Sequence, residues 1–486
     1  MHRTRSPCQS WDARRGSFMR PGLLATAAAL AFLFAHAGGG AGAVGDAALP
    51  GQFGVAHAQP DQLPFITTWK TDAANQTITI PLVGSGMAIS WGDGAVSIGV
   101  SGIATHAYAN PGTYEVSVYG GLEAISLDGH PDAARLVSID QWGDVPWRTM
   151  GSAFSGAANM AYAATDAPDL SRVTDMSQMF RGATAFNGDI SSWDTSSVTN
   201  MTHMFSVATA FNQPLNNWDV SSVTDMHGMF FAATSFNQPL NNWDVSSVTD
   251  MYAMFYGTPF FNRPLNNWDV SSVTSMSNMF HGAISFNQPL DSWDVSSVTD
   301  MGAMLQSAAS FNQPLDSWDV SSVTDMTRMF SHARSFNQPI GGWDVSSVTD
   351  MTSMFLRAGS FNQPLNTWDV SSVTNMTRML DFAASFDRNL GGWYVAIDNA
   401  SIDRADVPGM VGTISTQNAF LDGQNPTYLI EPGGDSDRFE ITGGNILRMV
   451  SADADRTVYT VTIYATGDSV FEDGNNRRTV QVTLVG

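Results

Sequence analysis

The sequence predicts a repeat solenoid with a β-rich module on either side. Nine tryptophans follow one another at intervals of 25 residues without a shift: Trp193, Trp218, Trp243, Trp268, Trp293, Trp318, Trp343, Trp368 and Trp393. Each lies in a close copy of one motif, best preserved at Phe211–Phe230. A fixed period of this length is typical of a solenoid, because one repeat cannot bury its apolar side alone and stacking closes a continuous core.

Two apolar patterns succeed one another within a repeat. Leu215, Trp218 and Val220 have the spacing of a short strand whose inward side chains stack on the next coil. The apolar residues that follow, up to Phe230, fall at intervals of three and one, which favours a helical or 3₁₀ turn. Thr224 is the expected N-cap of that turn. Residues 136–160 are expected to form a degenerate first repeat, because terminal repeats deviate.

An asparagine follows the second phenylalanine of most repeats. We expect this amide to be buried and stacked, so that it satisfies backbone groups of the turn in every coil. The column consists of Asn187, Asn212, Asn237, Asn262, Asn287, Asn312, Asn337 and Asn362.

The N-terminus has the order of a secretory signal. Several arginines precede the apolar run Leu23–Ala35, and small residues with Ala-x-Ala sites ending at Ala37 and Ala43 follow. We therefore expect a signal peptide at 1–43, a linker at 44–63 and a secreted or cell-surface location. The single cysteine, Cys8, lies before the apolar run, so no disulfide is expected in the mature chain.

The charge balance limits the classes of partner that the chain is expected to bind. The formal net charge is -23, with 45 Asp+Glu against 22 Lys+Arg. Nucleic acid and anionic membrane surfaces both select a basic patch, so neither is an expected partner. No later apolar segment has the length of a membrane span, and none is expected in the mature chain.

Residues 64–129 carry short strand patterns separated by turns. The run Trp91-Gly92-Asp93-Gly94, followed by Thr105-His106-Ala107-Tyr108 and Pro111-Gly112-Thr113-Tyr114, resembles a PKD-type domain. The resemblance implies an immunoglobulin-like β-sandwich with an adhesive or spacer role. Asp93 and His106 have two interpretations, a metal site or turn and core hydrogen bonding, and we favour the second.

The repeats from Ser192 to Leu380 resemble BspA-type leucine-rich-repeat surface proteins, in their Trp-Asp-Val-Ser-Ser-Val-Thr-x-Met-x-x-Met-Phe variant. The resemblance implies a leucine-rich-repeat-like solenoid of α/β coils of 25 residues at 130–400, flanked by β-sandwich modules. It also implies a secreted or cell-surface binding protein, adhesin-like and without enzymatic activity.

Residues 401–486 have alternating β patterns and turn signals. Phe439–Gly444 followed by Val458–Ala465 resembles a cadherin-like sandwich. The complete calcium motifs of cadherins are missing, so Ca²⁺ there is a guess that concerns four aspartates: Asp435, Asp437, Asp468 and Asp473.

Two aspartate columns run along the repeats. The first is Asp194, Asp219, Asp244, Asp269, Asp294, Asp319, Asp344 and Asp369, and the second includes Asp175, Asp225, Asp250, Asp300, Asp325 and Asp350. Stacked carboxylates repel, so a counter-ion such as Ca²⁺ is one interpretation. Turn capping is the other, and we favour it because Asn200, Ser275 and Asn375 interrupt the second column. No other cofactor is indicated.

The positions that vary between repeats are the candidates for function. Phe231, Tyr256 and Leu356 lie in one such column, and we predict them as binding contacts for protein or glycan on a cell surface or matrix. Drift at unconstrained positions explains them equally well. The sequence has no Gly-x-Ser-x-Gly nucleophile elbow, no histidine cluster with zinc-ligand spacing and no convincing pair of catalytic carboxylates, so no enzyme is indicated. The alternative function is a structural envelope or matrix protein that only spaces or self-assembles.

Overall fold

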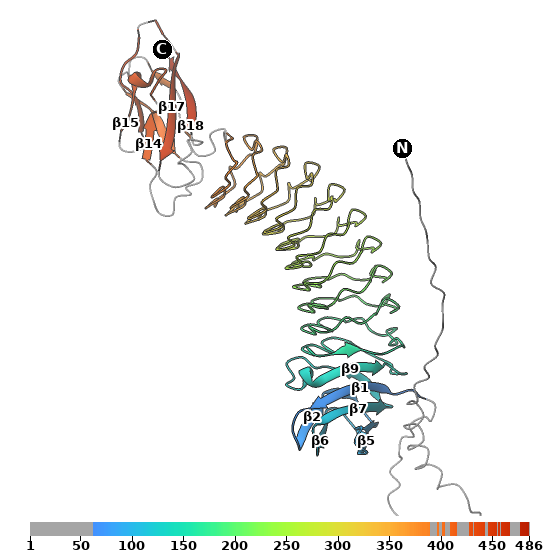
Figure 1. Cartoon of the computed structure of the whole chain (residues 1–486). Helices are drawn as coiled ribbons and strands as arrows, with labels where there is room; N and C mark the ends of the chain where they lie inside the picture. The colour runs from blue at the N-terminus through green and yellow to red at the C-terminus, as the bar shows by residue number, and fades with distance from the viewer. Residues whose placement is uncertain are drawn as a thin grey trace, which may run out of the picture. The chain divides into compact units, whose positions relative to one another are not determined.

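The computed structural model describes residues 62–388, 396–397, 401–403, 409–415, 427–430, 432–442, 446–453, 455–456, 458–466 and 477–485. The expected signal peptide, its cleavage sites, Cys8, Trp393, Asp468 and Asp473 lie outside these residues. The described chain is rich in β-structure (Figure 1).

The N-terminal module holds ten strands and one short 3₁₀ helix. They are β1 (Phe65–Thr71), β2 (Gln76–Ile80), β3 (Leu82–Gly84), β4 (Met87–Ser90), β5 (Val96–Val100), β6 (Ala104–Tyr108), β7 (Gly112–Tyr119), β8 (Leu122–Ile125), η1 (Ala133–Arg135), β9 (Leu136–Gln141) and β10 (Ala161–Tyr162). Six of the strands form a sheet in the order β10-β9-β1-β7-β4-β5, and two further pairs are β2-β6 and β3-β8.

Alternation of buried and exposed residues explains these strands. In β1, Phe65, Thr67, Trp69 and Thr71 face the core while the residues between them are more accessible. The short strand patterns expected within residues 64–129 are confirmed, for example as β2, β4 and β7.

The sheet continues into the region expected to be a degenerate repeat. β9 pairs with β1 antiparallel and with β10 parallel, so residues 136–141 belong to the N-terminal sheet. The repeat pattern of hydrogen bonds begins at Met150, whose N–H donates to the carbonyl of Asp175. One continuous core therefore runs from the N-terminal sheet into the repeats.

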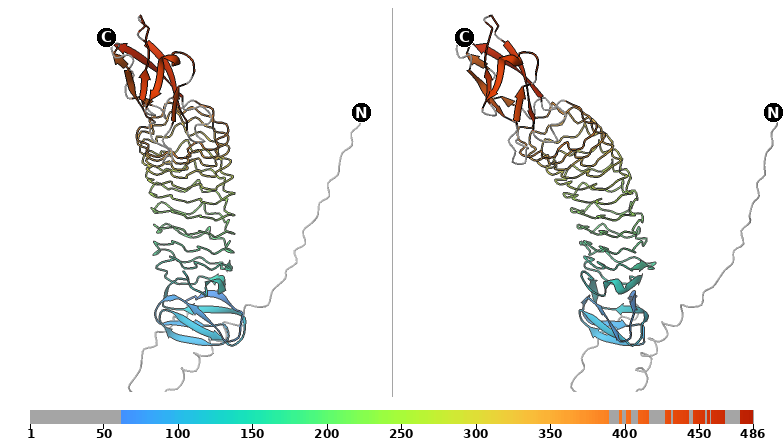
Figure 2. Two further views of the ribbon diagram at one scale, coloured as in Figure 1. Left: turned by 90° about the vertical axis from the view of Figure 1, so that its left-hand side faces the viewer. Right: turned by 60° about the vertical axis from the view of Figure 1, so that its left-hand side comes forward.

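Residues 148–388 form what we term the repeat stack, in which each 25-residue repeat lies on the next (Figure 1, Figure 2). Isolated parallel bridges join one residue per repeat along a column from Asp175 to Asn375. Backbone N–H groups donate to carbonyls 24 residues further along, as from Met201 to Asp225 and from Phe205 to Met229. Each coil is thus hydrogen-bonded to its neighbours through the backbone.

Two expectations for the single repeat are wrong. Leu215–Val220 is not a strand, since the parallel bridge falls at Asp225 instead. The residues after it form successive turns with no α-helix, so the α/β description of the coils does not hold for the described repeats. The expected N-cap, Thr224, donates its hydroxyl to the carbonyl of Thr199 in the preceding repeat.

Backbone conformation explains why no helix forms. Each coil places two residues, four apart, in the left-handed region, for example His203 at φ 54° and Val207 at φ 60°. A right-handed helix cannot include such residues. Between them the N–H groups of Met204 and Ser206 donate to carbonyls three residues earlier, and that of Phe205 donates to Met229 of the next coil. Local turns therefore alternate with bonds between coils.

Three aromatic columns run through the core of the repeat stack, beside columns of buried methionine, valine and leucine. The tryptophans from Trp193 to Trp368 are buried, with exposed fractions of 2–4%. Neighbouring indoles stack, as in Trp243 and Trp268, whose ring centroids lie 6.3 Å apart. Within a repeat, Phe255 and Phe261 stack at 4.1 Å. The predicted tryptophan ladder is confirmed over the described repeats.

The indole N–H groups hold the coils together as well. Trp268 Nε1 donates to the carbonyl of Leu240 at 2.9 Å, and the same bond recurs from Trp218 to Trp368. Each indole is therefore buried with its polar atom satisfied.

The C-terminal module contains β11 (Ala396–Ile397), β12 (Ser401–Asp403), β13 (Gly409–Ser415), β14 (Thr427–Ile430), η3 (Ser436–Arg438), β15 (Phe439–Thr442), β16 (Ile446–Met449), β17 (Val458–Thr466) and β18 (Arg477–Val485). Its two sheets have the orders β11-β13-β16-β15 and β12-β18-β17-β14. A separate core includes Val411, Leu447 and Tyr459. The β patterns expected within residues 401–486 are confirmed by these strands in the part that the structure describes.

Candidate binding face

The first aspartate column closes a turn in each repeat. Asp269 Oδ1 accepts the N–H of Ser271 at 3.1 Å and its hydroxyl at 2.7 Å. The hydrogen bond from the Ser271 side chain, helped by the backbone one, lowers the pKa of Asp269. The same arrangement lowers the pKa of other members, including Asp194, Asp219 and Asp294. The turn-capping interpretation is confirmed for this column.

The second column also serves the backbone. Asp225 Oδ1 accepts the N–H of His227, and Asn200 does the same for Thr202. An amide replaces the carboxylate at Asn200 and at Asn375 without loss of the bond, which explains these two interruptions of the column. At Asp300, burial raises the pKa, with the neighbouring Asp325 adding to the effect.

The asparagine column links consecutive coils. Asn287 Oδ1 accepts the N–H of Asn312 at 2.9 Å and Nε2 of Gln313 at 3.0 Å. Equivalent bonds join the column from Asn187 to Asn362. The predicted stacked amide is confirmed, although the residues are half-buried or exposed rather than fully buried.

Four positions per repeat lie outside the aspartate and asparagine columns and outside the buried core. They are the two residues between the methionines and the two after the phenylalanine, for example His227, Gly228, Phe231 and Ala232. We term this set of columns the variable face. Its backbone groups still bond to the neighbouring coils, so the side chains differ on a fixed frame.

In the repeats from 201 to 282 the variable face is aromatic. We term six residues the aromatic segment: His203, His227, Phe231, Tyr252, Tyr256 and His281. The ring of His227 lies 4.7 Å from both His203 and Tyr252. In the column just after the phenylalanine, the ring of Tyr256 lies 4.5 Å from the rings of both Phe231 and His281. The rings therefore form a continuous strip across four repeats.

Packing explains one glycine of this strip. A Cβ on Gly228 would lie 2.3 Å from the ring of His203, and its φ is +58°. Burial lowers the pKa of His203, and the nearby His227 lowers it further. His203 is thus held as a neutral ring that covers the glycine.

The three predicted contact residues share one column of the variable face. Phe231 and Tyr256 stack face to face with an interplanar angle of 7°. Leu356 lies four repeats beyond Tyr256, with His281, Gln306 and Ser331 between them. All three predicted residues are half-buried, so they offer edges to a ligand and not open faces.

The repeats from 326 to 382 carry cations on the same face. We term the cationic segment Arg328, His332 and Arg357, together with Arg334, which lies two residues past His332. The arginines are exposed and His332 is half-buried. Burial lowers the pKa of His332, and the charges of Arg357 and Arg334 lower it further. Sequence reasoning missed this cluster, although the scarcity of basic residues in the chain could have drawn attention to it.

In the N-terminal module, Asp93 and His106 contact one another. His106 Nε2 lies 2.8 Å from Asp93 Oδ2, and Asp93 Oδ1 accepts the N–H of Ala95. Burial alone would raise the pKa of Asp93, but these two hydrogen bonds outweigh it and lower the pKa. Trp91 stacks on His106 at 5.0 Å. The hydrogen-bonding role of the pair is confirmed.

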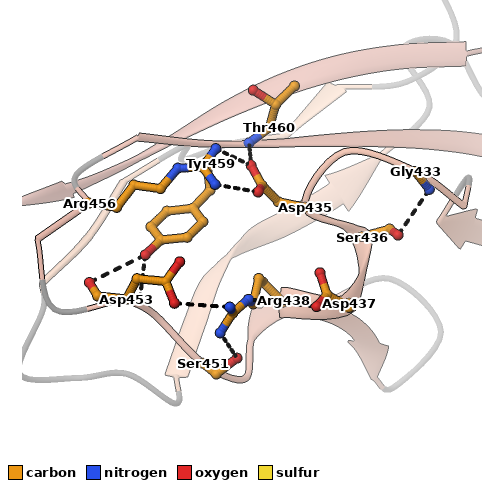
Figure 3. Close-up of polar contacts among 10 residues, drawn as sticks. All are labelled: Gly433, Asp435, Ser436, Asp437, Arg438, Ser451, Asp453, Arg456, Tyr459 and Thr460. Carbon is orange, nitrogen blue, oxygen red and sulfur yellow. Dashed lines mark hydrogen bonds and ion pairs between the residues drawn. The ribbon is translucent and has the colours of Figure 1, made fainter.

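In the C-terminal module, arginines engage the aspartates that were considered for calcium (Figure 3). Asp435 accepts two bonds from Arg456 at 2.6 and 2.7 Å and a third from the N–H of Thr460. Asp437 lies 3.7 Å from the guanidinium of Arg438. Asp435 thus serves as a structural anchor between a turn and β17.

Within the described ranges, no cluster of three or more His, Cys, Asp or Glu residues has the arrangement of a metal site. A search of the same ranges for helices finds none with the length and apolar character needed to cross a membrane.

Comparisons with known proteins give a family match that covers the repeats. A family model described as "Mycoplasma protein of unknown function, DUF285" matches residues 148–264, 238–335 and 315–404, which together span a little over half of the chain. No curated protein matches. Among solved structures, the functional domain of InlJ from Listeria monocytogenes, described as including a cysteine ladder, is similar at 12% identity and a TM-score of 0.19, over 73% of this chain and 92% of that one.

Proposed function

We propose that this chain, which belongs to the family of Mycoplasma proteins of unknown function DUF285, is a non-catalytic binding protein of the cell surface or the extracellular space. In this proposal the repeat stack is a leucine-rich-repeat-like solenoid of 25-residue coils. The flanking modules are a PKD-like and a cadherin-like β-sandwich. Their partner is a protein or a glycan on a cell surface or matrix.

One observation carries the proposal: the constant columns of each repeat serve the interior and the turns, whereas the variable face carries different side chains from repeat to repeat. The tryptophans fill the core, the aspartates close turns, and the asparagines join coils. A frame of this kind holds any side chains on its variable face, which is how repeat proteins present recognition surfaces.

The location rests on the N-terminal sequence and on the family. The charged, apolar and small-residue order of residues 1–43 is that of a secretory signal. A single cysteine within it leaves the mature chain without thiol chemistry, as suits a protein that keeps its shape by packing alone.

The aromatic segment is the first candidate for contact. Its rings are pre-ordered by stacking, so little side-chain entropy is lost when a partner covers them. We expect the mature chain to bind components of a glycan and matrix-protein array, with and without Ca²⁺. Replacing Phe231, Tyr256 and Leu356 by alanine together is expected to abolish capture of the ligand that this strip contacts.

Matched controls come from exposed serines in constant columns of the same repeats. The triple change Ser222→Ala, Ser247→Ala and Ser347→Ala is expected to leave binding unchanged. Absence of binding to every component of the array would contradict the proposed function.

A second function, that of a self-assembling spacer, is favoured by strand β5. It is an edge strand whose only partner among the described residues is β4. Val96 and Ile98 are 55% and 75% exposed, and Gly94–Thr105 contains no charge. Exposed apolar edges pair with other strands unless charges protect them. Sedimentation of the mature chain distinguishes the binding protein from the spacer, because only the spacer is expected to self-associate. If the chain does self-associate through β5, Ile98→Lys should restore a monomer.

A further inference from the structure

We propose that the cationic segment binds an acidic glycan, with Arg328, Arg334 and Arg357 as its ligands for carboxylate or sulfate groups. This inference rests on the proposed function and names the ligand class of one part of the variable face. Its ground is a local concentration of positive charge in a chain whose net charge is -23.

Stacking brings the residues together. The N–H of His332 donates to the carbonyl of Leu356, the residue just before Arg357, at 2.7 Å. Ser331, next to His332, donates its N–H to the carbonyl of Arg328 at 2.9 Å. Two neighbouring coils therefore place Arg328 and Arg357 around His332. The low pKa of His332, with Arg357 and Arg334 among its causes, agrees with this proximity.

The three guanidinium groups have no carboxylate partner within the described residues. Several other arginines have such partners, as in Arg135 with Asp132 and, on the same face, Arg378 with Asp381. Aspartates are abundant in the same repeats, yet they close turns in other columns. A cluster of like charges left without counter-charges in an acidic protein is the arrangement that an anionic ligand completes.

The backbone conformation at these positions is left-handed. Arg328, His332 and Arg357 have φ values of 57°, 60° and 58°, in the left-handed region. Equivalent positions of earlier repeats hold glycine, at Gly228, Gly257 and Gly282. A long cationic side chain at such a position costs conformational free energy that glycine avoids. Every coil has these two left-handed positions, and residues such as His203, Val207 and Ala303 occupy them in other repeats, so the frame holds Arg328 and Arg357 at fixed backbone positions.

A glycan suits the site better than a nucleic acid. Guanidinium groups form paired hydrogen bonds with carboxylate and sulfate, and three of them match a short acidic oligosaccharide. A nucleic acid carries a dense row of phosphates that the remaining negative charge of the chain would repel. Phe382, 66% exposed, lies beneath Arg357 with 5.3 Å between the guanidinium carbon and the ring centroid. Its ring supplies an apolar surface for a sugar next to the charge.

The test uses the mature chain and isothermal titration with a heparin oligosaccharide, polygalacturonate oligomers, neutral dextran and duplex DNA. We expect binding of at least one acidic glycan and none of dextran. The triple variant Arg328→Gln, Arg334→Gln and Arg357→Gln should weaken that binding by at least about tenfold for each guanidinium that contacts the ligand. Arg357→Lys, which keeps the charge and loses the paired geometry, should weaken it less than Arg357→Gln.

The control variant removes the same charge elsewhere. Arg148→Gln, Arg172→Gln and Arg263→Gln change exposed arginines outside the cationic segment and should leave binding within about twofold, because screening limits distant charges. Circular dichroism checks that both triple variants are folded.

Four results would overturn the inference: no binding of either acidic glycan, equal binding by the triple variant, an equal loss in the control variant, or tighter binding of DNA with the same arginine dependence. A neutral glycan or a protein captured through Phe231 and Tyr256 would leave the proposed function standing in each case. Absence of every ligand would end both.

Discussion

The aromatic and cationic segments occupy the same columns of the repeat stack and present different chemistry. Between 201 and 282 the variable face carries rings that cover one another. Between 326 and 382 it carries exposed arginines, of which Arg328 and Arg357 have no carboxylate partner among the described residues and Arg378 pairs with Asp381. Beneath both, the tryptophan and asparagine columns are the same, and the phenylalanine column differs only at Leu380. The frame and the face are therefore separable, and one frame can carry two recognition surfaces.

The largest expected effect concerns the shared frame. Trp268→Ala in the aromatic part and Trp343→Ala in the cationic part should each lower the free energy of unfolding by about 3–5 kcal/mol, because each leaves a cavity in a stacked column. Urea unfolding measures both. Costs that differ by more than about twofold between the two positions would break the claim of one common frame.

A smaller equal effect is expected for the asparagine column. Asn287→Ala leaves the N–H of Asn312 and the amide of Gln313 without their acceptor, and Asn337→Ala does the same to Asn362 and Gln363. Each variant should lose about 1–2 kcal/mol of stability. Changes within a few tenths of a kcal/mol in thermal and urea unfolding would show that these amides are not structural.

The two segments should respond in opposite directions at the left-handed positions. Gly282→Ala should destabilise the chain by about 1 kcal/mol, because its φ is +73°. Arg328→Gly should stabilise it by up to about 1 kcal/mol, since glycine relieves the same strain. The second variant should also bind acidic glycans more weakly. Stabilisation without any loss of binding would separate the strain from function.

The smallest expected effect depends on pH. The serine hydrogen bonds lower the folded-state pKa of Asp269 and Asp344, one in each part, below the unfolded value of about 4. Their contribution to stability is therefore complete above that unfolded pKa and is lost as the pH falls through the folded pKa. Melting temperatures measured from pH 5 to pH 2 should fall, and the fall should be less steep in Ser271→Ala and Ser346→Ala. An unchanged slope would exclude this contribution.

The sequence predicted the frame well where a column has a strict chemical need. The 25-residue period, the buried indoles, the stacked asparagines and most strands of both flanking modules follow from periodicity and alternation. The helical turn predicted at Val223–Phe230 was wrong because apolar spacing of three and one does not reveal a left-handed residue such as Gly228. That conformation is set by hydrogen bonds to the next coil, which no single repeat encodes.

The candidate site was only partly predictable. Variation between repeats located the column of Phe231 and Tyr256, but not their face-to-face stacking, which depends on coil spacing. Arg328 and Arg357 lie 29 residues apart and belong to different columns, so their proximity emerges only from stacking.

Cysteine labelling along one repeat tests the separation of frame and face most directly. In a Cys8→Ser background, which removes the single native cysteine, a cysteine at each position from Val248 to Tyr256 reports its own accessibility. We expect fast labelling at Thr249 and Tyr252 and slow labelling at Val248, Met251 and Phe255 in the folded chain. Uniform labelling along the repeat would contradict the account.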